Sequence, residues 1–164
     1  MKLVHAFDID MVGNGEIVTM GLSTCMCLCV VTNKGIIMWH YGILNKTKGM
    51  NMNRVSALLN TIQDKDVIRV YLVPGIDRNT DLSLKSDSRT MMHRPNTDPT
   101  ASRNWFISFM AKYPWFSRVQ VLEHVAHYKE LVVFHKTDKQ HGYNYGRDDA
   151  FFDRLCVLDA EQMT

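Results

Sequence analysis

Short runs of apolar and β-branched residues, separated by polar turns, recur along the chain and predict β-strands. Asn33, Lys34 and Gly35 separate two of these runs and are typical of a hairpin turn in which the glycine takes a positive φ. The expected strands are Leu3–Phe7, Glu16–Met20, Met26–Val31, Gly35–Tyr41, Val67–Val73, Arg118–His124, Glu130–His135 and Leu155–Leu158.

Two segments have helical periodicity instead. An apolar residue at every third or fourth position predicts a helix over Asn51–Asp64, with Asn51 as its N-cap. Its apolar stripe consists of Met52, Val55, Leu59 and Ile62. A second helix is expected to begin at Asp98 and Pro99, a cap followed by a first-turn proline, and to end before Pro114. The residues that it would bury are Trp105, Phe106, Phe109 and Met110.

These elements predict a single α/β domain over residues 1–164, built as a strand-rich mixed sheet or sandwich with two main helices. A long polar stretch, Asp77–Ala101, interrupts the pattern. Loops of this length inside one domain are uncommon and often serve as lids or binding loops. A surface excursion without a binding role is the alternative interpretation of this stretch.

Composition restricts the class of protein further. The chain has 164 residues, of which 46% are hydrophobic and 22% charged, with a net charge of +2. This balance is typical of a globular domain and too mild to predict a nucleic-acid or membrane partner. The sequence shows neither a Sec-type signal peptide nor an apolar run long enough to span a membrane. We therefore expect a monomer in the cytoplasm, or a protein delivered by a specialised secretion system into a host cytosol.

Cysteine is the residue type that first suggests chemistry. Cys25, Cys27 and Cys29 alternate along one expected strand, and Cys156 is distant in sequence. Residues at i and i+2 share a face of a strand but close a disulfide poorly, so we expect reduced thiols. A metal site made of the three thiols and His40 is an alternative. Three thiolates on one strand do not surround a tetrahedral zinc ion, however, and core positions are expected for Cys27 and Cys29.

Other candidate residues are assigned no role at this point. Four histidines in the C-terminal third show neither carboxylate partners nor the spacing of metal ligands, and we expect them on the surface or in strands. They are His124, His127, His135 and His141. Trp39 could wall a site beside His40, but a position in the core is favoured.

The hairpin brings a thiol and an imidazole together. Cys25 begins one strand and His40 lies near the end of the next, so the tight turn makes them neighbours. Such a pair can act as nucleophile and general base, and Thr19 is positioned to orient the imidazole ring. Gly21 opens the segment before the thiol. Spacing alone leaves an ordinary buried thiol and a satisfied histidine as the alternative.

A family resemblance strengthens the catalytic hypothesis. The run Ile17–Val30 resembles the signature of the CheD family of chemoreceptor glutamine deamidases, Ile-Val-Thr-Leu-Gly-Leu-Gly-Ser-Cys. The match implies that Cys25 is the nucleophile, His40 the general acid/base and Thr19 the orienting residue. It further implies a CheD-like fold, a target protein that carries a reactive glutamine, and no cofactor or metal. Ser23 and Thr24 are expected to support the oxyanion or to shape the turn with Gly21.

The segment Leu22–Cys25 is also similar to the Leu-Ser-x-Cys motif of deamidase toxins, which include cytotoxic necrotising factor and the Burkholderia lethal factor. The chain departs from the CheD pattern in two places. Pro74-Gly75 replaces a Gly-Gly-Ala-rich segment, and Leu44-Asn45 replaces Leu-Pro. We therefore favour a toxin or effector that deamidates a host protein. A chemoreceptor deamidase and an inactive binding module of the same fold are the alternatives, together with a redox or metal protein that uses the three alternating cysteines.

Overall fold

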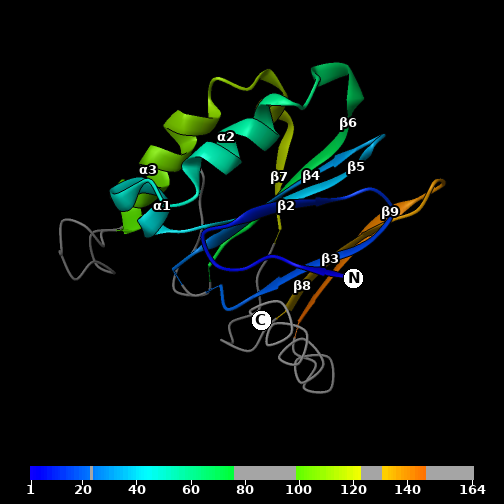
Figure 1. Cartoon of the computed structure of the whole chain (residues 1–164), viewed down its shortest axis with the longest axis horizontal. Helices are drawn as coiled ribbons and strands as arrows, with labels where there is room; N and C mark the ends of the chain where they lie inside the picture. Colours follow the sequence, from blue (N-terminus) through cyan, green and yellow to red (C-terminus); the bar gives the residue numbers. More distant parts are fainter. Residues whose placement is uncertain (23, 76–98, 123–130, 147–164) are drawn as a thin grey trace.

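The strands lie in two mixed sheets in the computed structural model, which describes residues 1–22, 24–75, 99–122 and 131–146 (Figure 1). The four-stranded sheet has the order β1 (Lys2–Leu3), β3 (Gly15–Met20), β8 (Leu131–Lys136) and β9 (His141–Gly146). The five-stranded sheet has the order β2 (Ile9–Val12), β5 (Gly35–Tyr41), β4 (Met26–Thr32), β6 (Val67–Val73) and β7 (Val119–Val121). Each contains one parallel pair, β1 with β3 and β6 with β7.

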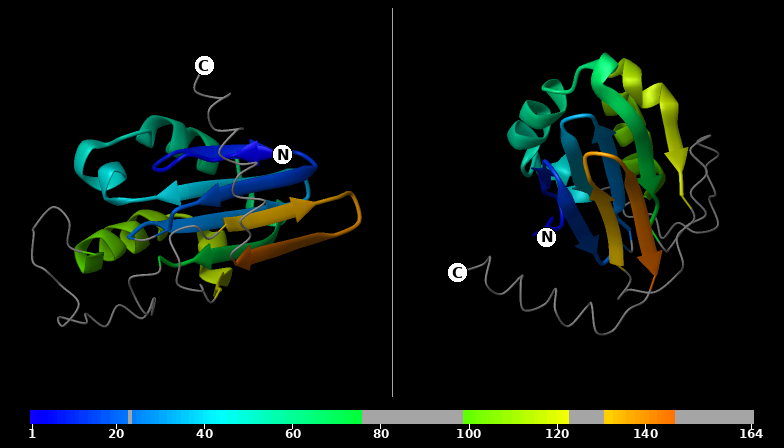
Figure 2. Two further views of the ribbon diagram at one scale, coloured as in Figure 1. Left: turned by 90° about the horizontal axis from the view of Figure 1, so that it is seen from below. Right: turned by 90° about the vertical axis from the view of Figure 1, so that its right-hand side faces the viewer.

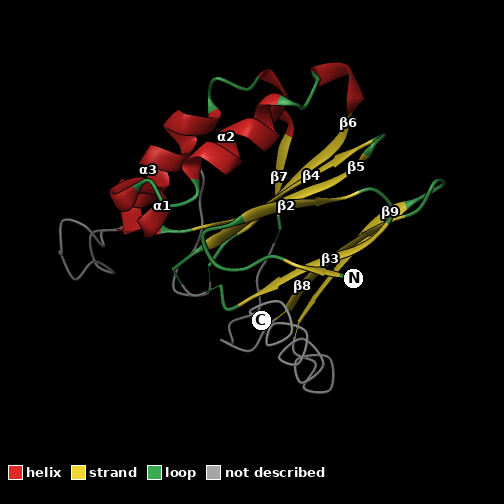
Figure 3. Cartoon of the chain, viewed as in Figure 1, coloured by secondary structure: helices red, strands yellow, loops and turns green. Residues whose placement is uncertain are grey.

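Three layers result from this arrangement. The helices α1 (Ile43–Lys48), α2 (Met52–Asn60) and α3 (Pro99–Met110) cover one face of the five-stranded sheet, and the four-stranded sheet covers the other (Figures 2 and 3). Single turns of 3-10 helix at Asp64–Asp66 and Pro114–Arg118 precede β6 and β7. The expected α/β class and mixed sheets are confirmed.

The position of β4 between two layers explains why its sequence is a continuous apolar run. All seven of its residues are buried, because the strand has a layer on each side. Met26, Leu28 and Val30 belong to the core under the helices, whereas Cys27 and Cys29 belong to the core between the sheets. Alternation along β4 therefore assigns the thiols to the inter-sheet face.

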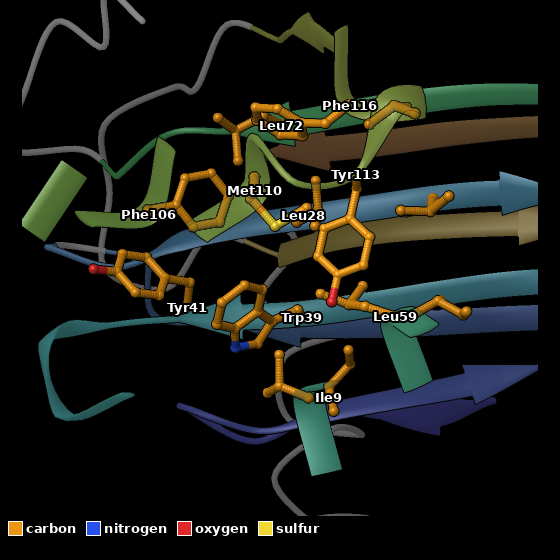
Figure 4. Close-up of a cluster of buried hydrophobic side chains, with 14 of the residues drawn as sticks. Ile9, Leu28, Trp39, Tyr41, Leu59, Leu72, Phe106, Met110, Tyr113 and Phe116 are labelled. Carbon is orange, nitrogen blue, oxygen red and sulfur yellow. The ribbon is translucent and has the colours of Figure 1, made fainter. Parts of the chain in front are cut away.

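An aromatic cluster joins the helices to the five-stranded sheet (Figure 4). Trp39 and Tyr41 of β5 pack against Phe106 of α3, with ring centroids 5.5 and 4.9 Å away. The buried Tyr41 hydroxyl donates a hydrogen bond to the Ser102 carbonyl oxygen at 2.6 Å. These contacts place α3 on the back of the strand that carries His40.

Several element boundaries differ from the sequence prediction. β1 ends at Leu3 rather than Phe7, because the chain turns between His5 and Asp8: the Asp8 N–H donates to the His5 carbonyl oxygen at 3.1 Å, and Phe7 within this turn has a φ of 67°. α2 ends at Asn60 rather than Asp64. Asn51 occupies the N-cap position as predicted, but in a left-handed conformation and without a side-chain capping bond. β2, β9 and the short α1 were not predicted.

The hairpin turn at Gly35, where φ is 154°, and a helix from Pro99 that ends before Pro114 are confirmed, whereas the expected cap Asp98 lies outside the described residues. Trp105 and Phe109 of α3 are only partly buried. The predicted strand Leu155–Leu158, Cys156 and most of the stretch Asp77–Ala101 lie outside the described residues. Among the helices of the described ranges, none has the length and apolarity required to cross a bilayer.

Tyr41→Phe should lower the free energy of unfolding by about 1 kcal/mol, because it removes the buried hydrogen bond from the Tyr41 hydroxyl to Ser102 while retaining the aromatic packing. Urea denaturation monitored by circular dichroism measures this change. Tyr113→Phe is the matched control, since the Tyr113 hydroxyl donates to Asn60 Oδ1 at a partly exposed position and its loss should matter less. Equal losses in the two variants would contradict a buried link between β5 and α3.

Candidate active site

The turn before β4 positions the Cys25 thiol. Gly21 follows β3 with a φ of 73°, a left-handed conformation that suits glycine, and Leu22 is then buried in the core between the sheets. Thr24 is exposed, and Ser23 lies outside the described residues. Cys25 follows with 9% of its surface exposed, at the edge of the same core. The segment thus brings the thiol to the margin of the inter-sheet core.

The hairpin register fixes where His40 lies relative to Cys25. His40 pairs directly with Cys27, and Met26 pairs with Tyr41. Cys25 therefore lies one position further along, beside Gly42: a Cβ built on this glycine would be 2.8 Å from the Cys25 sulfur. Residues opposite one another, and those two apart on a strand, share a face. The thiol and the imidazole thus lie on the inter-sheet side, on diagonal rather than directly paired positions.

Thr19 reaches His40 from the other sheet. Its hydroxyl lies 2.7 Å from His40 Nδ1, and the same hydroxyl donates to the Val4 carbonyl oxygen at 2.8 Å. A hydroxyl has only one proton to donate, so Thr19 must accept a hydrogen bond from Nδ1–H. The neutral imidazole is consequently protonated on Nδ1, and its Nε2 carries a free electron pair. Thr19 and His40, proposed from sequence as partners, are in contact.

Burial keeps the His40 ring neutral. The residue is 2% exposed, and desolvation lowers its pKa from 6.5 to about 4. Its Nε2 atom is buried and makes no hydrogen bond within the described structure. A buried acceptor without a partner is uncommon, and a catalytic role is one of the explanations for it. The resting site therefore has a neutral base, and a permanent thiolate–imidazolium pair is disfavoured.

The other two thiols of β4 have a different environment from Cys25. Cys27 and Cys29 are fully buried, and desolvation raises the pKa of each well above its usual value. Such thiols are poor nucleophiles and poor metal ligands at neutral pH. Across the described ranges, no three or more His, Cys, Asp or Glu residues group in a way that could hold a metal ion. The predicted core positions of Cys27 and Cys29 are confirmed.

Phe7 and Gly42, which lie beside the thiol, and Asn45, which binds the backbone of both, were not assigned to the site from the sequence. A Cβ on Gly42 would lie 2.4 Å from the Phe7 ring, so this glycine allows ring and sulfur to approach the backbone. Asn45 accepts a hydrogen bond from Gly42 N–H at 3.0 Å, and its amide donates to the Phe7 carbonyl oxygen at 2.8 Å. The spacing of Gly42 and Asn45, typical of the start of a helix, was the sequence signal that could have identified these two residues. Phe7 had none.

The remaining candidates lie elsewhere. Trp39 packs into the aromatic cluster under the helices, on the face of β5 opposite His40, so its predicted core position is confirmed. His135 and His141 lie on β8 and β9, next to one another in the register and partly buried. His124 and His127 lie outside the described residues.

Comparison with known proteins adds no family to this geometry. No protein-family model matches the chain, and no curated protein is significantly similar to it.

The low pKa of His40 predicts a specific dependence of stability on pH. Between the folded pKa of about 4 and the ordinary value of 6.5, the unfolded state binds more protons at this residue than the folded state does. The contribution of His40 is therefore complete above pH 6.5 and declines as the pH falls towards 4, by roughly 3 kcal/mol in total.

Urea denaturation of the wild type and of His40→Asn across this pH range measures the effect. The variant replaces the imidazole by an amide that does not titrate, so the difference between the two curves isolates His40 from the other histidines. A difference that shrinks below pH 6.5 is expected. A constant difference between pH 7 and 4 would contradict a buried neutral imidazole.

Proposed function

We propose that this protein is a cysteine deamidase that hydrolyses a glutamine side-chain amide of a target protein to glutamate. The observation that carries the proposal is the Thr19–His40 hydrogen bond. It leaves Nε2 as an unprotonated, unpartnered acceptor on the face shared with Cys25. A thiol beside a base whose ring is oriented by a third group is the arrangement used for nucleophilic attack on carbonyl carbons.

The chemistry proceeds in two halves. Cys25 transfers its thiol proton to His40 Nε2 while the sulfur attacks the γ-carboxamide carbon, which forms a tetrahedral oxyanion. The imidazolium then returns the proton to the departing nitrogen, and ammonia leaves a thioester. Water, deprotonated by Nε2, hydrolyses the thioester and regenerates the thiol. Thr19 accepts the Nδ1 hydrogen bond throughout and stabilises the transient imidazolium.

The burial of His40 suits this role. A low pKa makes the imidazolium a strong acid, which favours protonation of a poor leaving group such as an amide nitrogen. The same low pKa makes the neutral ring a weak base, so the thiol proton is transferred only as the sulfur attacks the substrate carbon. The neutral resting ring is in the correct state to accept the thiol proton at neutral pH. No metal or organic cofactor is required by either half-reaction.

Limited access to the thiol favours a side-chain amide as the substrate. Only 9% of Cys25 and 2% of His40 is exposed. The end of a glutamine side chain is slender enough to reach such a thiol, whereas a peptide bond inside a folded target would require a wider opening. Deamidation is for this reason preferred over peptide hydrolysis.

The resemblance of Ile17–Val30 to the CheD signature agrees with this reaction, and we propose that the two sheets and helices form a CheD-like fold. The Leu-Ser-x-Cys motif supports a toxin or effector that acts on a host protein in the cytosol. A chemoreceptor of the producing cell is the alternative target. Gly21, Ser23 and Thr24 are proposed to form the turn whose backbone N–H groups receive the oxyanion.

Incubation of the purified protein with eukaryotic and bacterial lysates should convert specific glutamines to glutamate. Tryptic peptides analysed by mass spectrometry should show a gain of about 1 dalton, or about 3 daltons in ¹⁸O-labelled water, since the hydrolytic oxygen comes from the solvent. Cys25→Ser and His40→Asn should abolish the gain, whereas Cys29→Ser should retain it. Glutamate formation that persists in Cys25→Ser would contradict the proposal.

Thr19→Val should lower the deamidation rate about 10- to 100-fold, because it removes the acceptor that orients the imidazole while keeping the side-chain shape. Thr19→Ser retains the hydroxyl and should recover most of the activity. Initial rates of ammonia release from the identified target measure both variants. If Thr19→Val were as active as the wild type, the orienting role would be wrong.

A further inference from the structure

Phe7 has an unusual backbone conformation next to the proposed nucleophile. Its φ of 67° is left-handed, a conformation that is uncommon and strained for a bulky residue. Glycine or asparagine would make the same turn with less strain. The side chain, rather than the turn, is therefore the feature that requires an explanation.

The Phe7 ring lies beside the Cys25 sulfur. A Cβ built on Gly42 would be 2.4 Å from ring atom Cε1 and 2.8 Å from the sulfur, so both lie within 3.0 Å of one point. The ring packs against the inter-sheet core that includes Cys25, yet it is only partly buried. An aromatic face thus borders the thiol and remains partly open to solvent.

Hydrogen bonds tie the backbone of Phe7 to the strand that carries His40. Phe7 N–H donates to the His40 carbonyl oxygen at 2.8 Å, and the Phe7 carbonyl oxygen accepts from the Asn45 and Asn51 side-chain amides at 2.8 and 3.2 Å. Asn45 is 1% exposed and also donates to the Met50 carbonyl oxygen at 2.7 Å. These bonds hold the strained residue in place relative to His40 and Cys25.

We propose that Phe7 is a specificity-determining residue whose ring forms an apolar wall beside the Cys25 thiol, against which the methylene groups of the substrate glutamine pack. The inference rests on the proposed deamidase function and goes beyond it by assigning the selection of side-chain length and width. Glutamine has two methylenes between its Cα and its amide, and asparagine has one. Contact with a fixed wall therefore favours glutamine and excludes wide groups from the thiol.

Alkylation of Cys25 tests the wall without requiring a known target. Rate constants for iodoacetamide, a slender reagent, and N-phenylmaleimide, a wide one, are measured at Cys25 by peptide mass spectrometry. Phe7→Gly, which also relieves the left-handed strain, should raise the maleimide rate about tenfold relative to the iodoacetamide rate. Phe7→Leu retains part of the wall and should give an intermediate ratio.

Val12→Ala is the matched control, because Val12 is also a partly buried residue packed against the inter-sheet core but lies at the far end of β2. Its ratio should equal that of the wild type, with Cys27 and Cys29 unmodified in every folded variant. If Phe7→Gly does not fold, the buried Cys27 and Cys29 become alkylated as well. The ratio measured for Phe7→Leu then decides whether the wall exists.

An unchanged ratio in the Phe7 variants, or an equal rise for both reagents, would overturn the proposal. A different result would show that the wall exists but the deamidase function does not. In that case the Phe7 variants would change the alkylation ratio, and the wild-type protein would convert no glutamine in any lysate. Where a target is identified, Phe7→Gly should also lower the preference for glutamine over asparagine at the modified position. An unchanged preference would likewise contradict the wall.

Discussion

The hydrogen bond between Thr19 and His40 is the interaction on which the site depends. It crosses from the four-stranded sheet to the five-stranded sheet and joins side chains that are buried between them. Because the Thr19 hydroxyl gives its proton to Val4, the imidazole can only donate to it. The packing of two sheets thereby selects one tautomer of the His40 ring, and the chemistry that we propose for the Cys25 thiol depends on that tautomer.

The fold supports this interaction from both sides. The tight turn before Gly35 sets the hairpin register and hence the offset between Cys25 and His40. The aromatic cluster on the opposite face of β5 fixes the strand against α3, where Tyr41 is anchored to Ser102. A neutral, buried imidazole is costly to protonate, and this cost both destabilises the protein in acid and makes the ring an effective proton donor once charged.

Much of this arrangement could be predicted because it is local in sequence. The hairpin, its turn and the face shared by Cys25 and His40 follow from alternation and from the spacing of a two-stranded unit. The contact of Thr19 with His40 was expected from the order of the strands. β2 and β9 were missed because they are edge strands that carry polar residues or glycine, whose preference for strands is weak.

The environment of the thiol could not be predicted in the same way. Phe7 adopts its left-handed conformation only because distant groups, the His40 carbonyl and the Asn45 amide, bind its backbone. The burial that lowers the pKa of His40 likewise arises from the second sheet, which no local pattern reveals. Spacing and the family resemblance thus identified the groups that we propose to react, and tertiary contacts determine their protonation and access.

The protonation of His40 can be observed directly by long-range ¹H–¹⁵N NMR correlation of the imidazole nitrogens in the wild-type protein. We expect a neutral ring that is protonated on Nδ1 at pH 7, with Nε2 unprotonated and no titration until the pH approaches the value of about 4. A ring protonated on Nε2, or an imidazolium at neutral pH, would contradict the orientation of the base by Thr19 and with it the proposed mechanism.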